Sequence, residues 1–267
     1  MDHALAPEGF RAAVALVRQA ADVFAAERIT AVHAKSATDF VTNVDFAIQT
    51  RLRGQLAALA PDVQFIGEED DAASVDRTKP YWLLDPVDGT TNLIHGLNHS
   101  AVSLALVEQG AVSFGVVCDP YSRECFTAVR GEGARMNGAP IRCSRNQELD
   151  SCLVSAGTAP GHRDLADEVF SAIRKVYDAC QDIRHGGCAS LDLCHIACGR
   201  LDGYFERVLH PWDYAAGMLI VNEAGGAVTD FDGCAPSLET PSEIAASNGA
   251  VHRELAAILR RPMRERA

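Results

Sequence analysis

The spacing of apolar side chains predicts two helices near the start of the chain. Residues 8–27 repeat apolar positions at helical intervals, and residues 46–59 also read as a helix. Between them, residues 35–45 are polar and interrupted, which predicts a loop or a hairpin. The apolar face of the first predicted helix is formed by Phe10, Val14, Val17, Ala21 and Phe24.

Residues 63–142 change to short apolar runs that are separated by turn residues. The segment VQFIG is a short predicted strand that runs into acids, and YWLLD reads as a buried strand that ends just before Pro86. Two β-rich runs meet at Gln109 and Gly110, which is a hairpin signal. We therefore predict that these strands follow one another in sequence and pair mostly antiparallel.

After about residue 148, predicted strands and helices alternate along the chain. One of these helices begins at Pro211 and is followed by glycines, the usual placement of the two residue types at helix ends. Alternation of this kind favours a doubly wound second half. We predict a mixed α/β protein in which residues 1–147 form an α+β domain and residues 148–267 form an α/β domain.

Composition and charge narrow the class of protein. The 267 residues are 48% hydrophobic, which is enough for a large core. No apolar run approaches the roughly 20 residues of a membrane span, and the N-terminal segment does not have the pattern of a signal peptide. The net charge of -12 argues against direct nucleic-acid binding, which needs clustered Lys and Arg. We expect a cytoplasmic protein with neither a membrane nor a nucleic acid as partner.

The chain has nine cysteines, an odd number. Because no secretory signal accompanies them, we expect reduced thiols packed in the core. Cys188, Cys194 and Cys198 lie close together in sequence. They lack the paired spacing that is typical of a zinc site.

The segment WLLDPVDGTTNLIHG brings two aspartates, Asp85 and Asp88, directly after a predicted buried strand. Two carboxylates that lie close together cannot both stay ionised without a cation, and hard oxygen ligands favour Mg²⁺ or Mn²⁺. Gly89 leaves the main chain open to a ligand, and Thr90 begins a predicted helix whose first N–H groups would bind an anion. The segment is typical of a phosphate held on a metal, although taken alone it is also typical of an ordinary acidic turn.

Acids elsewhere in the sequence strengthen the metal hypothesis. Glu68 and Glu69 follow the predicted strand VQFIG, Asp213 lies in the first turn of the helix that Pro211 opens, and Asp45 ends the segment TNVD. Asp213 and Asp45 would each also suit a helix N-terminus, where a carboxylate caps free N–H groups. Both readings stay open at this point.

The ordered set GEE, WLLDPVDGTTNLIHG and HPWDYAAGMLIVNEAGG resembles the inositol monophosphatase family, and the resemblance covers nearly the whole chain from residue 35 onward. It implies a layered αβαβα sandwich, a homodimer, and two or three Mg²⁺ ions, with Mn²⁺ as a possible substitute. In the family, one ion is held by residues at Glu68, Asp85 and the backbone carbonyl of Val87. A second lies between Asp85, Asp88 and Asp213, and a weaker third shares Glu68.

The resemblance also implies catalytic and substrate-binding residues. Asp45 and Thr90 would activate a water molecule with Glu68 close by. Cys188 stands where Ser or Thr is common, so a hydroxyl donor would be lost, and Arg207 stands where an apolar residue is usual, so the rim of the pocket would change. Lys35 lies in a loop that folds over the metals in the family, or it is a plain surface lysine. The implied substrate contacts are Asp88, Gly89, Thr90, Gly187, Cys188, Ala189 and Glu206.

The resemblance predicts hydrolysis of a small phosphorylated polyol, foremost myo-inositol 1-phosphate. Other substrates within the family are histidinol phosphate, fructose 1,6-bisphosphate and phosphoadenosine nucleotides. A small cation retained between three aspartates after turnover would also make the activity sensitive to lithium and to excess Mg²⁺. A hypothesis of another class is a regulatory partner of the transcription machinery, because some bacterial relatives have that role.

Overall fold

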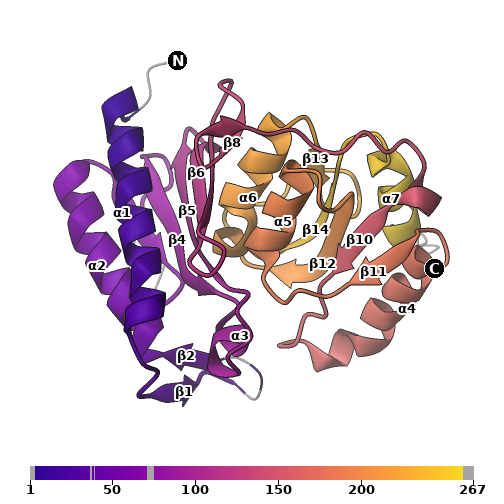
Figure 1. The fold of residues 1–267 in the computed structure, drawn as a ribbon, viewed down its shortest axis with the longest axis horizontal. Helices are drawn as coiled ribbons and strands as arrows, with labels where there is room; N and C mark the ends of the chain where they lie inside the picture. Colours follow the sequence, from indigo (N-terminus) through magenta and orange to yellow (C-terminus); the bar gives the residue numbers. More distant parts are fainter. Residues whose placement is uncertain (1–3, 37, 39, 71–74, 261–267) are drawn as a thin grey trace.

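The computed structural model describes residues 4–36, 38, 40–70 and 75–260 of the chain. Figure 1 shows its layers in the order α1 and α2, a seven-stranded sheet, α5 and α6, a five-stranded sheet, and α4 with α7. The predicted mixed α/β sandwich is therefore confirmed. The helices are α1 (Pro7–Ala26), α2 (Asn43–Leu59), α3 (Thr90–Ile94), α4 (Ala166–Tyr177), α5 (Ala189–Ala197), α6 (Pro211–Glu223) and α7 (His252–Leu259).

Two short strands, β1 (Val32–Ala34) and β2 (Phe40–Thr42), pair antiparallel before α2, where the sequence predicts a loop or hairpin. Helix α2 begins three residues earlier than predicted because Thr42 and Asp45 cap it. The Thr42 hydroxyl accepts the N–H of Val44, and the Asp45 carboxylate accepts the N–H of Thr42.

The seven-stranded sheet runs in the order β3-β4-β5-β6-β7-β8-β9. Only the β3–β4 pair is parallel. Gln109 and Gly110 join β5 to β6 with φ of 53° and 73°, as a type I′ turn requires, so the predicted hairpin is confirmed. The strands are β3 (Gln64–Gly67), β4 (Tyr81–Asp88), β5 (Ala101–Glu108), β6 (Ala111–Asp119), β7 (Glu124–Val129), β8 (Ala134–Met136) and β9 (Ala139–Pro140).

Strand β4 is longer than the sequence predicts. It continues through Pro86 to Asp88, and its pairing with β5 shifts register between Asp85 and Asp88. A proline, which has no N–H for the ladder, is tolerated in such an irregular stretch. The irregularity therefore lets the strand carry both aspartates at its end.

Alternate side chains of β4 enter different cores, as the two-residue period of a strand requires. Trp82 and Leu84 pack in the cluster beneath α1 and α2, whereas Tyr81 and Leu83 pack in the cluster that includes residues of α5 and α6. Both faces of the sheet are therefore covered, one by each half of the chain.

The second sheet runs in the order β11-β10-β12-β14-β13. Strand β10 is parallel to both neighbours, and β14 is antiparallel to both of its own, so this half is a mixed sheet rather than a purely parallel one. Its strands are β10 (Leu153–Ala156), β11 (Asp182–Arg184), β12 (Gly203–Leu209), β13 (Ala227–Thr229) and β14 (Ser242–Ser247).

Helix α6 lies very close to the first sheet. A Cβ atom placed on Gly115 of β6 would lie 2.9 Å from the carbonyl oxygen of Ala216 and 3.0 Å from its Cα. Glycine is therefore the residue that lets α6 pack against this strand. The packing joins the two halves in one apolar cluster.

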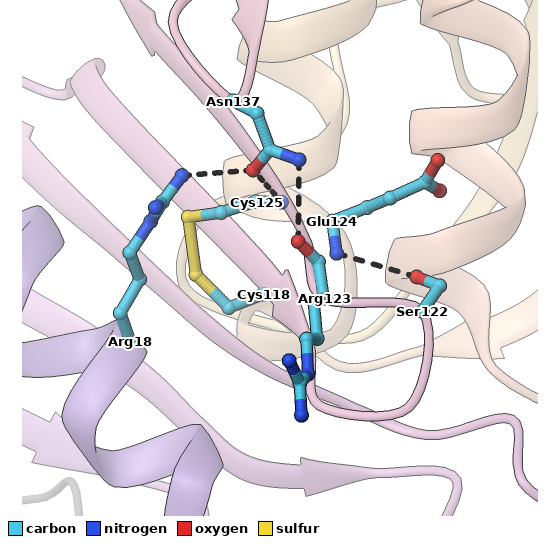
Figure 2. The surroundings of a disulfide bond; sticks show 7 residues. All are labelled: Arg18, Cys118, Ser122, Arg123, Glu124, Cys125 and Asn137. Carbon is cyan, nitrogen blue, oxygen red and sulfur yellow. Dashed lines mark hydrogen bonds between the residues drawn. A yellow bond between two sulfur atoms is a disulfide. The ribbon is translucent and has the colours of Figure 1, made fainter.

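The cysteines differ from the sequence prediction at one pair. Cys118 of β6 and Cys125 of β7 form a disulfide between directly paired residues (Figure 2), so the expectation that all nine thiols are reduced is wrong. The two residues meet only because a seven-residue separation folds back through a strand turn, which composition alone does not reveal. Among the described residues, no helix combines the length and the apolar character of a membrane span.

Candidate functional site

Two carboxylates lie side by side where Glu68 follows the end of β3 and Asp85 lies in the neighbouring parallel strand β4. The strands pair through Gly67 and Leu84, and the N–H of Glu68 donates to the carbonyl of Leu84 at 3.0 Å. Asp85 is 2% exposed, and its Oδ1 accepts the N–H of Val87 at 2.9 Å. The pairing of the two strands thus brings Glu68 next to Asp85.

Two further aspartates join them, one from each half of the chain. Asp88 ends β4, and its Oδ2 accepts the N–H of Ser190 at 2.6 Å and the Cys188 thiol at 3.1 Å. Asp213, in the first turn of α6, accepts the N–H of His210 at 2.7 Å. The side chain of Asp213 therefore caps the helix and also lies among the other three acids.

The cluster carries more negative charge than its surroundings support. Burial raises the pKa of Asp85 well above its usual range, and the charges of Glu68, Asp88 and Asp213 raise it further. The pKa of Asp213 is likewise raised by burial and by Asp88 and Glu68. Burial raises the pKa of Glu68 to about 7, against the opposing effect of Lys35. The four acids, named here the acidic cluster, are Glu68, Asp85, Asp88 and Asp213.

A cation of the chain already contacts this cluster. The ammonium of Lys35 lies 2.9 Å from Oε1 of Glu68 and also contacts Glu69, and its pKa is raised by these partners although burial alone lowers it. Lys35 is therefore no plain surface lysine.

The donor set of the acidic cluster fits a hard divalent ion. It consists of carboxylate oxygens, together with the carbonyl of Val87, in a buried place where Lys35 contacts only Glu68 of the four acids. In the described part of the chain, no group of three or more His, Cys, Asp or Glu side chains is placed to hold a metal ion as the structure stands. The carboxylates instead bond to Lys35, Ser190 and the backbone of His210, so metal binding would exchange these partners for the ion.

Asp45 and Thr90 meet beside the cluster. The Thr90 hydroxyl lies 3.2 Å from Oδ1 of Asp45 and 2.9 Å from the carbonyl of Val87, and it can donate to only one of them at a time. Asp45 is fully buried, and burial raises its pKa while its hydrogen bonds from Thr42 lower it. The pair can therefore hold and pass a proton at the edge of the acidic cluster.

Gly89 links the acidic cluster to the opposite half of the chain. It precedes α3 with a φ of 88°, and a Cβ there would lie 3.2 Å from the carbonyl of Gly187 and 3.1 Å from that of His99. A side chain would be strained by both the φ and the contacts. The glycine thereby keeps the backbone of α3 close to the loop before α5.

Residues proposed to touch the alcohol come together at that loop. Gly187, Cys188 and Ala189 form the start of α5, next to Asp88. Glu206 of β12 accepts the N–H of Ala159 at 3.0 Å and the Tyr204 hydroxyl at 2.6 Å, and burial raises its pKa. Glu206 is thus held in place by the protein and is not a solvated strand end.

Comparison with known proteins decides the family. The model of the inositol monophosphatase family matches residues 6–264. The chain belongs to the inositol monophosphatase family. Within the family it is 42% identical, over 74% of each chain, to a protein named Nus factor SuhB from Pasteurella multocida.

Solved structures of family members agree. The extragenic suppressor protein suhB from Bartonella henselae superposes with a TM-score of 0.90 at 32% identity, covering 96% of this chain and 100% of that one. An IMPase/NADP phosphatase solved with Mg²⁺ and phosphate has a TM-score of 0.83 at 26% identity, covering 93% of this chain and 94% of that one.

Two departures from the family pattern have a structural explanation. Burial raises the pKa of the Cys188 thiol well above its usual range, so the thiol stays neutral and donates to Asp88. The hydroxyl donor is absent at this position, and the thiol, which is a weaker donor than a hydroxyl, donates in its place. The guanidinium of Arg207 contacts Glu243 and lies 5.2 Å from the ring of Phe231, so it does not lie at the rim beside Glu206.

Sequence reasoning missed two residues of this site. The side-chain amide of Asn92 in α3 donates to the carbonyls of His99, Gly186 and Gly187 at 2.8, 2.9 and 3.2 Å. The N–H of Ser190 holds Asp88. Asn92 lies inside the family motif, so the motif could have pointed to it. The backbone contact of Ser190 leaves no signal in the sequence.

Proposed function

We propose that the chain is a Mg²⁺-dependent phosphatase of small phosphate monoesters, with myo-inositol 1-phosphate as the first substrate to test. One observation carries the proposal: the acidic cluster draws buried carboxylates from both halves of the chain, and burial together with the charges of the neighbouring acids raises the pKa values of Asp85 and Asp213. Glu68, Asp85, Asp88, Asp213 and the carbonyl of Val87 would hold the ions.

Bound divalent ions would neutralise the phosphate, acidify a water molecule and stabilise the leaving alkoxide. The chain's own groups would do the rest. Asp45 would take a proton from water, with the Thr90 hydroxyl orienting that water and Glu68 nearby. The N–H groups at Gly89 and Thr90 would bind phosphate oxygens. Glu206 is already fixed by Tyr204 and Ala159, and it retains acceptor capacity for the hydroxyls of a polyol.

The test is phosphate release at saturating Mg²⁺ from a panel of substrates. The panel holds inositol 1-phosphate, histidinol phosphate, fructose 1,6-bisphosphate and a phosphoadenosine nucleotide, with Asp88→Asn as the inactive control. We expect release that chelator abolishes and that is fastest from inositol 1-phosphate. Equal turnover with and without chelator would refute the proposal.

A second function, that of a regulatory partner of the transcription machinery, has its own support. Relatives named Nus factor SuhB are about 40% identical to the chain, for example the protein from Salmonella typhimurium at 40% over 248 residues. This likeness supports the regulatory role more strongly than it supports inositol 1-phosphate as the substrate. Both roles can reside in one protein.

A pull-down separates the two roles. Asp88→Asn should lose turnover but still capture transcription proteins from a lysate if binding is independent of catalysis. Capture that disappears together with turnover would argue against a separate binding role. That the protein forms a homodimer and that it is cytoplasmic also stay predictions.

A further inference from the structure

A groove of about 530 Å³ lies between α1 and the strands β6 and β7. None of the candidate site residues lines it. Its floor is apolar: Phe10 and Phe114 are buried and stack with ring centroids 5.1 Å apart, and Val14 and Val129 are half-buried. The volume lies in the range of small-molecule pockets.

The rim of the groove is positively charged. Arg18 donates from Nη2 to Oδ1 of Asn137 at 2.8 Å, and Arg135 donates from Nη1 to the carbonyl of Gly138 at 3.1 Å. These partners are neutral oxygens, and in the described part of the chain neither guanidinium has a carboxylate within 4.0 Å. Glu132 is the one acid among the lining residues.

Two fixed contacts position this rim (Figure 2). Oδ1 of Asn137 also accepts the N–H of Cys125 at 3.1 Å, and its Nδ2 donates to the carbonyl of Arg123 at 3.2 Å. The Cys118–Cys125 disulfide ties β6 to β7 beside it. Asn137 thus holds the Arg18 side chain of α1 against a cross-linked part of the sheet, which reduces the ordering that a ligand would have to impose.

We propose that this groove binds a small organic anion with an apolar body. The apolar part would cover Val14, Phe114 and Val129, and the acid group would accept hydrogen bonds from Arg18 and Arg135. Charge complementarity favours this occupant, because the chain as a whole has a net charge of -12 whereas the rim is positive. The guanidinium donors that remain free can bind two oxygens of one carboxylate or sulfonate.

The probe is 8-anilinonaphthalene-1-sulfonate, which joins an apolar body to a sulfonate and fluoresces when buried. N-phenyl-1-naphthylamine has the same body without the charge and serves as the matched probe. We expect saturable binding of the sulfonate to the full chain. In Arg18→Gln/Arg135→Gln its Kd should rise by about tenfold or more, while the Kd of the uncharged probe changes by less than about twofold.

The control variant is Arg253→Gln, which removes an exposed arginine of α7 and should leave both Kd values unchanged. Circular dichroism verifies that all variants fold. Equal sulfonate affinity in the parent and in the double variant overturns the proposal. So does a double variant that turns a dimer into a monomer in sedimentation while the probe has no effect, because a second copy of the chain would then be the occupant.

Discussion

Single residues of the acidic cluster have two tasks at once. Asp213 caps α6 through the N–H of His210, and its raised pKa shows that it also shares the field of Asp88 and Glu68. The two alternatives that the sequence leaves open, helix cap and metal ligand, are therefore compatible. A substitution that keeps the cap and removes the charge separates them.

Asp213→Asn should leave the metal-free protein at least as stable as the parent, because like-charge repulsion is relieved while an acceptor for His210 remains. Stabilisation by Mg²⁺ scales with RT ln(1 + [L]/Kd) and should shrink. Turnover should fall by orders of magnitude. Thermal melts with and without Mg²⁺, beside phosphate release, measure these effects. A variant that melts lower without metal, yet responds fully to Mg²⁺ and stays active, would leave Asp213 as a cap only.

Asp192 of α5, which is not a member of the acidic cluster but is affected by the charge of Asp88, provides a pH prediction. Its Oδ2 accepts the Ser155 hydroxyl at 2.9 Å, and burial raises its pKa to about 7. Because the folded pKa exceeds the unfolded one, the folded protein holds this proton more tightly. The stability that follows is present at low pH and is lost as pH rises from about 4 through about 7.

Asp192→Asn, which stays neutral, should therefore gain stability relative to the parent as pH increases across that interval. Melting temperatures of metal-free protein at several pH values measure the difference. Asp164→Asn, at an exposed acid, is the matched control. If the stability difference between Asp192→Asn and the parent stays constant with pH, the buried acid does not titrate as we infer.

At the scale of elements, the site depends on how α3 meets the loop before α5. Asn92 is the connection, since one side-chain amide serves three carbonyls. Gly89 contributes the close approach of the backbone. Helix α3 and the loop before α5 are thereby held at a fixed separation.

Asn92→Ala should remove the donor that the carbonyls of His99, Gly186 and Gly187 share and cost about 0.5–1.5 kcal/mol of unfolding free energy, because these groups are partly exposed. If the chain has the proposed activity, KM for inositol 1-phosphate should rise more than KM for an aryl phosphate, which does not use the loop. Asn98→Ala, at an exposed asparagine nearby, is the matched control. Losses of the same size on both substrates would mean that the loop does not contact the alcohol.

The contact between β6 and α6 gives a prediction for packing. Gly115→Ala should destabilise the protein by about 1–3 kcal/mol, because a methyl group would press on the backbone at Ala216. Gly54→Ala, in α2 with nothing near its added Cβ, should instead stabilise by about 0.5–1 kcal/mol. Urea unfolding of both variants measures this. A neutral Gly115→Ala would show that α6 can move aside.

Elements with strong local signals could be predicted from the sequence, and contacts between distant segments could not. The Gln109–Gly110 turn and the helix opened by Pro211 follow from backbone preferences of the residues themselves. The extension of β4 beyond Pro86, the Cys118–Cys125 disulfide and the Lys35–Glu68 ion pair depend on segments that meet only after folding. The members of the acidic cluster could be predicted only because the motifs resemble those of a known family. The roles of these residues stay predictions.

At the scale of the whole molecule, the two halves share one of the apolar clusters. The apolar cluster that includes Leu83 and Val117 of the first sheet also includes Leu193, Tyr214 and Ile220 of the second half. The predicted boundary near residue 147 falls in a connecting segment, and the two halves that it separates share this packed apolar cluster. This makes the independence of the two predicted domains a testable matter.

Residues 1–147 and 148–267, expressed separately, should each show a loss of cooperative unfolding, because each exposes its share of this core. Neither should release phosphate, since one fragment would carry Asp213 and the other fragment would carry the remaining three acids of the acidic cluster. Circular dichroism melts and phosphate release on each fragment measure this. A fragment 1–147 that melts as sharply as the whole chain would show that the first half is an autonomous domain.

The contact of α6 with the first sheet at Gly115 is made late in synthesis, because the sheet leaves the ribosome before the helices that cover it. The first sheet is complete when β9 ends at Pro140, but the helices that cover its inner face end only at Glu223. At about 5–20 residues per second, the roughly 80 residues between them take on the order of 4–16 s to synthesise. During that interval the nascent chain has an uncovered apolar sheet face. The speed of translation between these two points, and the chaperones that meet the chain there, therefore influence the yield of active protein.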